Sequence, residues 1–182
     1  IVSVDSMQVY RGMDIGTAKP SADDRRRVPH HMIDVADPSE AYSVARFQEA
    51  GRAAIREIRG RGQRVLVVGG SGLHFRALVD PLVFAPSDPS ARSRMEAMSP
   101  ADAVGALLAV DPAAGRHVDL ANPRRVIRAL EVHAVTGDTP TGRSATPEAA
   151  AVRAYRSIEP VAAVGIDPGT RLGRRVGNRL ER

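Results

Sequence analysis

Hydrophobic residues along this chain fall into short continuous runs and longer stretches with helical spacing. A short apolar run between turn residues is typical of a buried strand, whereas apolar residues three or four positions apart indicate an amphipathic helix. The first pattern predicts strands at residues 1–4, 31–35, 64–68 and 161–166, and the second predicts helices at about 43–59, 73–79 and 123–136, with a last helix from 167 onward. Strands that alternate with helices predict an α/β fold, a parallel sheet flanked by helices.

End signals define the limits of the helix predicted at 123–136. Asn122 followed by Pro123 is a typical start, because the asparagine caps free amides and proline suits the first helical position. Gly137 is a typical stop. Residues 138–151, rich in Thr, Pro and Ala, are expected to form a flexible loop.

A change of composition divides the chain. From Asp80 to about Asn122 the sequence is rich in Pro, Ser, Asp and Ala, with two short amphipathic stretches. We expect a small helical insertion lobe at residues 86–119, and an α/β core made of residues 1–85 and 120–182. The chain starts in a predicted core strand and stops inside a predicted helix, so we expect this core to be incomplete at both ends.

Composition limits the chemistry. The 182 residues include 26 Lys and Arg against 21 Asp and Glu, and Lys19 is the only lysine. There is no cysteine, which excludes disulfides, a thiolate nucleophile and Cys-ligated zinc. The apolar runs are too short to span a bilayer and no signal peptide opens the chain, so we expect a cytoplasmic protein without a membrane partner. A coding bias toward Ala and Arg explains why nearly all basic residues are arginine. The net charge of +5 still favours an anionic partner, nucleic acid or phosphate.

Two strand ends carry candidate ligand-binding residues. Asp5 and Ser6 follow the first strand, and ligands of open α/β sheets bind outside the carboxyl ends of strands. The segment Gly69-Gly70-Ser71-Gly72 follows the strongest strand, where free amides at a helix start favour anions. Capping by Asp5 and close packing of the glycines are the structural alternatives.

Other motifs are excluded or weak. The segment GMDIGTAK at residues 12–19 is not a Walker A loop, because lysine must directly follow the second glycine. His30 and His31 are adjacent and cannot form a helical metal pair, so structural roles are expected. No nucleophile-elbow sequence G-x-S-x-G is present.

Arginines line two predicted helices. Arg124 and Arg128 share one helix face with Glu131, and Arg125 lies alongside. On the last helix, Arg171, Arg175, Arg179 and Arg182 form a stripe. Such cations repel one another unless an anion lies across them, so diphosphate or RNA phosphate is one interpretation and a solvated face is the other.

Taken together, these segments resemble the tRNA dimethylallyltransferase (tRNA isopentenyltransferase) family. The matching blocks, in family order, are DSMQVYRGMDIGTAKP (5–20), VPHHMID (28–34), DPSEAYS (37–43), VGGSGL (68–73), DPSAR (88–92), DP (111–112) and NPRRVIRALEV (122–132). The resemblance implies a P-loop NTPase-like core whose phosphate loop is missing from this chain. It implies transfer of a dimethylallyl group from dimethylallyl diphosphate to N6 of the adenosine on the 3′ side of the tRNA anticodon. It further implies a monomer assisted by Mg²⁺, with no metal ligand within this chain.

The resemblance also implies residue roles. Asp5 matches the general base, Ser71 the residue at which base and isoprenoid meet, and Arg179, with Arg175 beside it, the group that neutralises the leaving diphosphate. The implied tRNA contacts are Asp5, Ser6, Met7, Gln8, Ser71, Arg92, Arg124, Arg125, Val126, Ile127 and Arg128. Three positions depart from the family pattern: Ser71 replaces Thr, His74 replaces Tyr and Arg124 replaces Gln.

Without a phosphate loop, the chain by itself is expected to be a weak or inactive part of a working transferase. Two other functions stay open. One is an adenylate isopentenyltransferase that uses a free nucleotide as acceptor. The other is a catalytically inactive tRNA-binding remnant, which would bind an anticodon stem-loop with steep salt dependence and transfer nothing.

Overall fold

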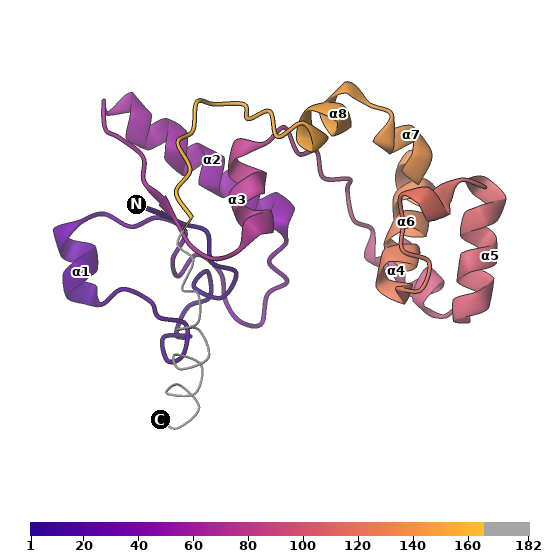
Figure 1. The fold of residues 1–182 in the computed structure, drawn as a ribbon. Helices are drawn as coiled ribbons and strands as arrows, with labels where there is room; N and C mark the ends of the chain where they lie inside the picture. The colour runs from indigo at the N-terminus through magenta and orange to yellow at the C-terminus, as the bar shows by residue number, and fades with distance from the viewer. Residues whose placement is uncertain (166–182) are drawn as a thin grey trace, which may run out of the picture.

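The computed structural model describes residues 1–165 of the chain. A small parallel sheet and three helices make up one part, three further helices make up a second, and α7 and α8 lie between the two (Figure 1). The elements are β1 (Val2–Ser3), α1 (Ala22–Arg27), α2 (Val44–Gly60), β2 (Val67–Val68), α3 (Gly72–Val79), α4 (Pro89–Glu96), α5 (Pro100–Val110), a short 3-10 turn (Ala114–Arg116), α6 (Pro123–Thr136), α7 (Pro140–Ser144) and α8 (Pro147–Arg153). The predicted α/β class with a parallel sheet is confirmed, in a helix-rich form.

Strand β1 lies between β2 and the residue His31. It pairs in parallel with β2, with Val2 opposite Val67, and its other edge takes up His31. The Ser3 amide donates to the His31 carbonyl at 3.0 Å, and the His31 amide donates to the Ile1 carbonyl at 2.9 Å. Residues distant in sequence therefore converge around the end of β1, just before Asp5.

The prediction of a strand at residues 31–35 is wrong. Met32 and Asp34 have φ angles of 66° and 56°, in the left-handed region that an extended strand cannot contain. Only isolated bridges remain, at His31 and at Ala36. The segment turns because the Asp34 carboxylate is drawn toward two cations, Lys19 and Arg25.

Helices α2 and α3 pack across the sheet and form the first hydrophobic core. Phe47 is fully buried and Leu78 is 2% exposed. At Gly51 a Cβ atom would lie 2.5 Å from a methyl group of Leu78, so only glycine allows this close helix crossing. The side chain of Arg52 closes the end of α3 by donating to the carbonyls of Ala77 and Asp80.

A second core lies among α4, α5 and α6. Leu107 on α5 is fully buried against Val126 and Leu130 on α6. The predicted limits of α6 are confirmed, since the Asn122 side chain accepts from an amide of the first turn and Gly137 has a φ of 76°. The predicted division placed residues 120–182 with the α/β core, whereas α6 packs on α4 and α5 because its apolar face meets theirs.

Two further expectations differ from the structure. The loop predicted at 138–151 contains α7 and most of α8, because Thr139-Pro140 and Thr146-Pro147 each supply a threonine cap followed by proline. Of the strand predicted at 161–166, residues 161–165 are not in a strand, and residue 166 lies outside the described residues, as does the helix expected after it. Among the described helices, none is both long and apolar enough to cross a membrane.

Candidate active site and basic groove

Asp5 leaves the end of β1 in a tight turn. Its Oδ1 atom accepts from the amides of Met7 at 2.8 Å and Gln8 at 3.2 Å. Its Oδ2 atom has no hydrogen-bond partner within residues 1–165. Asp5 can therefore both cap the turn and bind a ligand, since one carboxylate oxygen caps the turn while the other is left for a ligand.

The residues after Asp5 divide into exposed and internal side chains. Ser6 and Met7 are exposed. Gln8 faces inward: its amide nitrogen donates to the carbonyls of Thr17 and Ala18 at 3.0 and 3.1 Å, and its Oε1 accepts from Ser3. Gln8 therefore ties the loop to the sheet, while RNA contact by these residues stays a prediction.

Lys19 organises the same loop from within. Its side chain is only 2% exposed, and its Nζ donates to the Tyr10 carbonyl at 2.6 Å, Asp14 at 2.9 Å and Asp34 at 2.6 Å. Burial alone lowers the pKa of Lys19, but the two carboxylates outweigh it and hold the pKa above its ordinary value. The lysine that superficially suggests a phosphate loop is thus a structural cation, a role that sequence reasoning missed.

The glycine-rich turn lies directly against the end of β1. The Ser71 amide donates to the Val4 carbonyl at 3.1 Å, which brings Ser71 beside Asp5. At Gly69 a Cβ atom would stand 2.6 Å from the Val4 carbonyl, so the close approach requires glycine. The hydroxyl of Ser71 lies 2.6 Å from Nδ1 of His74. The two predicted catalytic residues of the described chain, Asp5 and Ser71, are therefore neighbours.

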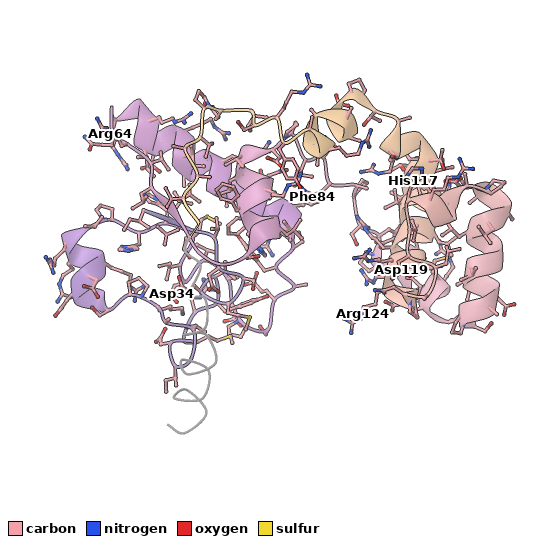
Figure 2. The ribbon with its side chains drawn as sticks, viewed as in Figure 1. Asp34, Arg64, Phe84, His117, Asp119 and Arg124 are labelled. Atoms are coloured by element: carbon pink, nitrogen blue, oxygen red, sulfur yellow. The ribbon has the colours of Figure 1, made fainter. Side chains whose placement is uncertain are left out.

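A large basic groove lies in the second part of the structure. It encloses about 1380 Å³ and is bordered by α4, α6, α7, α8 and the segment around His117. Figure 2 shows His117 and Arg124 in this part, away from Asp34. We call it the basic groove, for its arginines Arg92, Arg116, Arg124, Arg125, Arg128, Arg143 and Arg153.

The arginines of the basic groove are of two kinds. Arg92 pairs with Glu96 at 2.9 Å, and Arg128 pairs with buried Glu131 at 2.9 Å and donates to the carbonyls of Ala85 and Pro86. Arg116, Arg124 and Arg125 are exposed and form no ion pair with any described residue. The second kind combines exposure to solvent with a charge that no described residue neutralises, as binding to an anion requires.

The apolar members of the predicted tRNA-contacting helix lie differently. Val126 is 1% exposed in the second core, and RNA contact at this position stays a prediction. Ile127 is half-buried. Arg175 and Arg179, expected at the diphosphate, lie outside the described residues.

Glu131 anchors the wall of the basic groove. It is fully buried, and its Oε1 accepts from the Ser87 hydroxyl at 2.6 Å and the Asp88 amide at 3.0 Å. Burial raises the pKa of this carboxyl, but the contacts with Ser87 and Arg128 outweigh it and hold the pKa below its ordinary value. Glu131 thus joins α6 to the segment that leads into α4.

Replacing Glu131 by Gln is expected to lower the free energy of unfolding by about 2 kcal/mol, because a buried charge-assisted network loses its anion. Denaturant unfolding measures this change. Glu96→Gln is the matched control: it also removes an arginine partner, but Glu96 is exposed, so the expected change is below about 0.5 kcal/mol. Equal effects of the two substitutions would contradict the anchoring role of Glu131.

Comparison with known proteins places the chain in a family. The family model described as IPP transferase matches residues 8–182. This chain belongs to the IPP transferase family. It is 45% identical over 171 residues to a tRNA dimethylallyltransferase of Bifidobacterium longum (strain NCC 2705), covering 92% of this chain and 50% of that protein. It is 42% identical over 187 residues to a tRNA dimethylallyltransferase of Kineococcus radiotolerans, covering all of this chain and 56% of that protein.

A solved structure agrees with this IPP transferase assignment. A eukaryotic dimethylallyltransferase captured in crystallographic snapshots acting on tRNA has a TM-score of 0.71 and 27% identity, and the match covers 100% of this chain and 46% of that one. The chain spans about half the length of the curated relatives it matches. The resemblance stated from the sequence blocks is confirmed.

Proposed function

We propose that the complete product of the gene encoding this chain transfers a dimethylallyl group from dimethylallyl diphosphate to N6 of the adenosine on the 3′ side of the tRNA anticodon. The observation that carries the proposal is the Asp5 carboxylate, next to Ser71 at the carboxyl end of β1, in a member of the IPP transferase family. Relatives named tRNA dimethylallyltransferase support it.

In this reaction the N6–carbon bond forms and the carbon–oxygen bond to diphosphate breaks. An exocyclic amine is a weak nucleophile, so a base that takes its proton lowers the barrier. The free oxygen of Asp5 is the proposed acceptor of that proton. Cations stabilise the charge that develops on the leaving diphosphate, and Arg175 and Arg179 are proposed for this role.

Mg²⁺ belongs to the same proposal. Within residues 1–165 no group of three His, Asp or Glu side chains could hold a metal ion. Mg²⁺ usually binds through one or two carboxylates, water and substrate phosphates, so the diphosphate would supply several of its ligands. No step assigned to Asp5 or Ser71 depends on the ion. The P-loop NTPase-like core of the complete protein is likewise part of the proposal.

A transfer assay tests the proposal. The complete protein is incubated with isotopically labelled dimethylallyl diphosphate and with unmodified tRNA, AMP or both. We expect the label on N6 of the tRNA adenosine and none on AMP. Label on AMP would favour the adenylate isopentenyltransferase. Salt-sensitive binding of an anticodon stem-loop without any transfer would favour the tRNA-binding remnant.

The basic groove is the proposed tRNA-binding surface. Replacing Arg124 and Arg125 together by Gln is expected to weaken stem-loop binding and to reduce the slope of log K against log salt by about 2, one for each lost phosphate contact. Fluorescence anisotropy over a salt series measures both. Arg94→Gln is the control, since Arg94 is an exposed arginine on α4 outside the groove lining. An unchanged slope in the double variant would place the RNA elsewhere.

A further inference from the structure

Ser71 is unusual among the residues that begin helices in this protein. It occupies the N-cap of α3, where a serine side chain normally accepts from an amide of the first turn. Its side chain makes no such bond, whereas each of the other seven α-helices within residues 1–165 has a side-chain cap. The hydroxyl is instead 2.6 Å from Nδ1 of His74, three residues along the helix. A capping bond has thus been replaced by a bond to an imidazole.

The ring of His74 is held firmly in place. It meets the ring of Phe47 edge to face, with centroids 4.5 Å apart, and Phe47 is fully buried. Burial lowers the pKa of His74, and the nearby Asp5 carboxylate offsets this only in part. The ring is therefore neutral at physiological pH, and one of its two nitrogens is an acceptor. Phe47 on α2 packs against the ring of His74. The charged group that acts on the pKa of the ring is Asp5, which follows β1.

We propose that His74 is a positioning residue: its Nδ1 accepts a hydrogen bond from the Ser71 hydroxyl, which leaves the Ser71 oxygen as an acceptor, beside Asp5, for an N–H of the substrate amine. A serine hydroxyl carries one proton and two lone pairs. When the proton is directed at His74, only the lone pairs face the site. The inference rests on the proposed function, because the N–H donor is the exocyclic amine of adenosine.

The arrangement gives a distinct dependence on pH. Above the lowered pKa of His74, the ring is neutral and Nδ1 can accept. As the pH falls through that pKa, Nδ1 gains a proton and becomes a donor. The Ser71 proton then turns toward the site and opposes the amine N–H. Transfer activity is therefore expected to decline as the pH falls through the lowered pKa of His74.

Two substitutions of His74 separate positioning from packing. His74→Phe keeps an aromatic ring against Phe47 but removes the acceptor, so kcat should fall about tenfold with KM little changed. His74→Asn places an amide oxygen close to the position of Nδ1 and cannot titrate. It should keep kcat within about threefold of the original and shift the acid limb of the pH profile to lower pH.

A double-substitution cycle with Ser71→Ala provides the decisive comparison. If His74 acts through Ser71, His74→Phe should cost little further kcat once the hydroxyl is gone. Full additivity of the two effects would overturn the proposal, and so would equal loss in His74→Phe and His74→Asn. Thermal unfolding of each variant, measured alongside, shows whether α3 stays folded.

Nitrogen NMR of the histidine-labelled complete protein tests the bond without any assay of transfer. His74 is assigned by comparison with His74→Asn. We expect the neutral ring to carry its proton on Nε2, and Ser71→Ala to change the shift of Nδ1. A proton on Nδ1 would overturn the proposal. If the protein transfers no prenyl group but shows the Nε2–H ring, the proposed function fails and the Ser71–His74 bond stands.

Discussion

Replacing Asp5 by Asn in the complete protein is expected to reduce kcat for the proposed dimethylallyl transfer about a thousandfold, because a carboxamide cannot accept the amine proton. The substitution should leave the local fold intact, since the asparagine oxygen can still accept from the amides of Met7 and Gln8. Binding of the anticodon stem-loop should therefore stay within about twofold, a change of about 0.4 kcal/mol. Single-turnover transfer and stem-loop binding, measured on the same preparation, check the two halves of this prediction.

Asp119→Asn is the matched control for Asp5→Asn. Asp119 also receives an amide two residues along, from Ala121 at 3.1 Å, and it lies in an exposed loop of the other part of the structure (Figure 2). The same loss of one charge at the same kind of turn should leave kcat unchanged. Substantial turnover in Asp5→Asn would show that another group accepts the proton.

Replacing Lys19 by Met is expected to lower the free energy of unfolding by about 3 kcal/mol, because it leaves two carboxylates and a carbonyl without their shared cation. Asp34 would keep only Arg25 as a charged partner, and Asp14 would lose its partner within the described chain. Since Gln8 and Lys19 hold the same loop, transfer activity should fall as well. Denaturant unfolding and the transfer assay measure the two effects.

The pH dependence of stability gives the Lys19 prediction a second readout. Burial raises the pKa of Asp34, but Lys19 and Arg25 outweigh it and hold the pKa below its ordinary value. The stability contributed by Asp34 is therefore complete above the ordinary aspartate pKa and is lost as the pH falls through the lowered one. In Lys19→Met the folded-state pKa of Asp34 should rise toward its ordinary value, so this contribution should be smaller and its loss should be complete at a higher pH.

Arg26→Gln is the control for Lys19→Met. Arg26 also pairs with an aspartate, Asp23, but both side chains are more than two-thirds exposed. Exposed pairs contribute little, so the expected change in unfolding free energy is below about 0.5 kcal/mol. A Lys19→Met effect no larger than that of Arg26→Gln would contradict the structural role of Lys19.

Local signals predicted α2, α3 and α6 well. Their apolar spacing, and the Asn122 cap of α6, involve residues three or four positions apart, so a single sequence contains the whole interaction. A cap residue followed by proline is also present at Thr139-Pro140 and Thr146-Pro147, but the composition of residues 138–151 is typical of a loop and led to the wrong prediction. The strand predicted at 31–35 failed for another reason. Its apolar residues fit a strand, but Asp34 is drawn to Lys19, 15 residues earlier in the chain.

The sequence by itself determined the family, through the blocks at residues 5–20, 68–73 and 122–132, and it excluded a Walker A loop in this chain. The tertiary structure alone decided which charged groups are available to a ligand. Arg124 and Arg128 lie on one helix and look alike in sequence, yet only Arg128 is neutralised, by a buried carboxylate that is fixed from Ser87, 44 residues earlier in the chain. Glu131 is only three residues from Arg128, but its burial and its orientation come from Ser87 and Asp88, which only the folded chain brings to it.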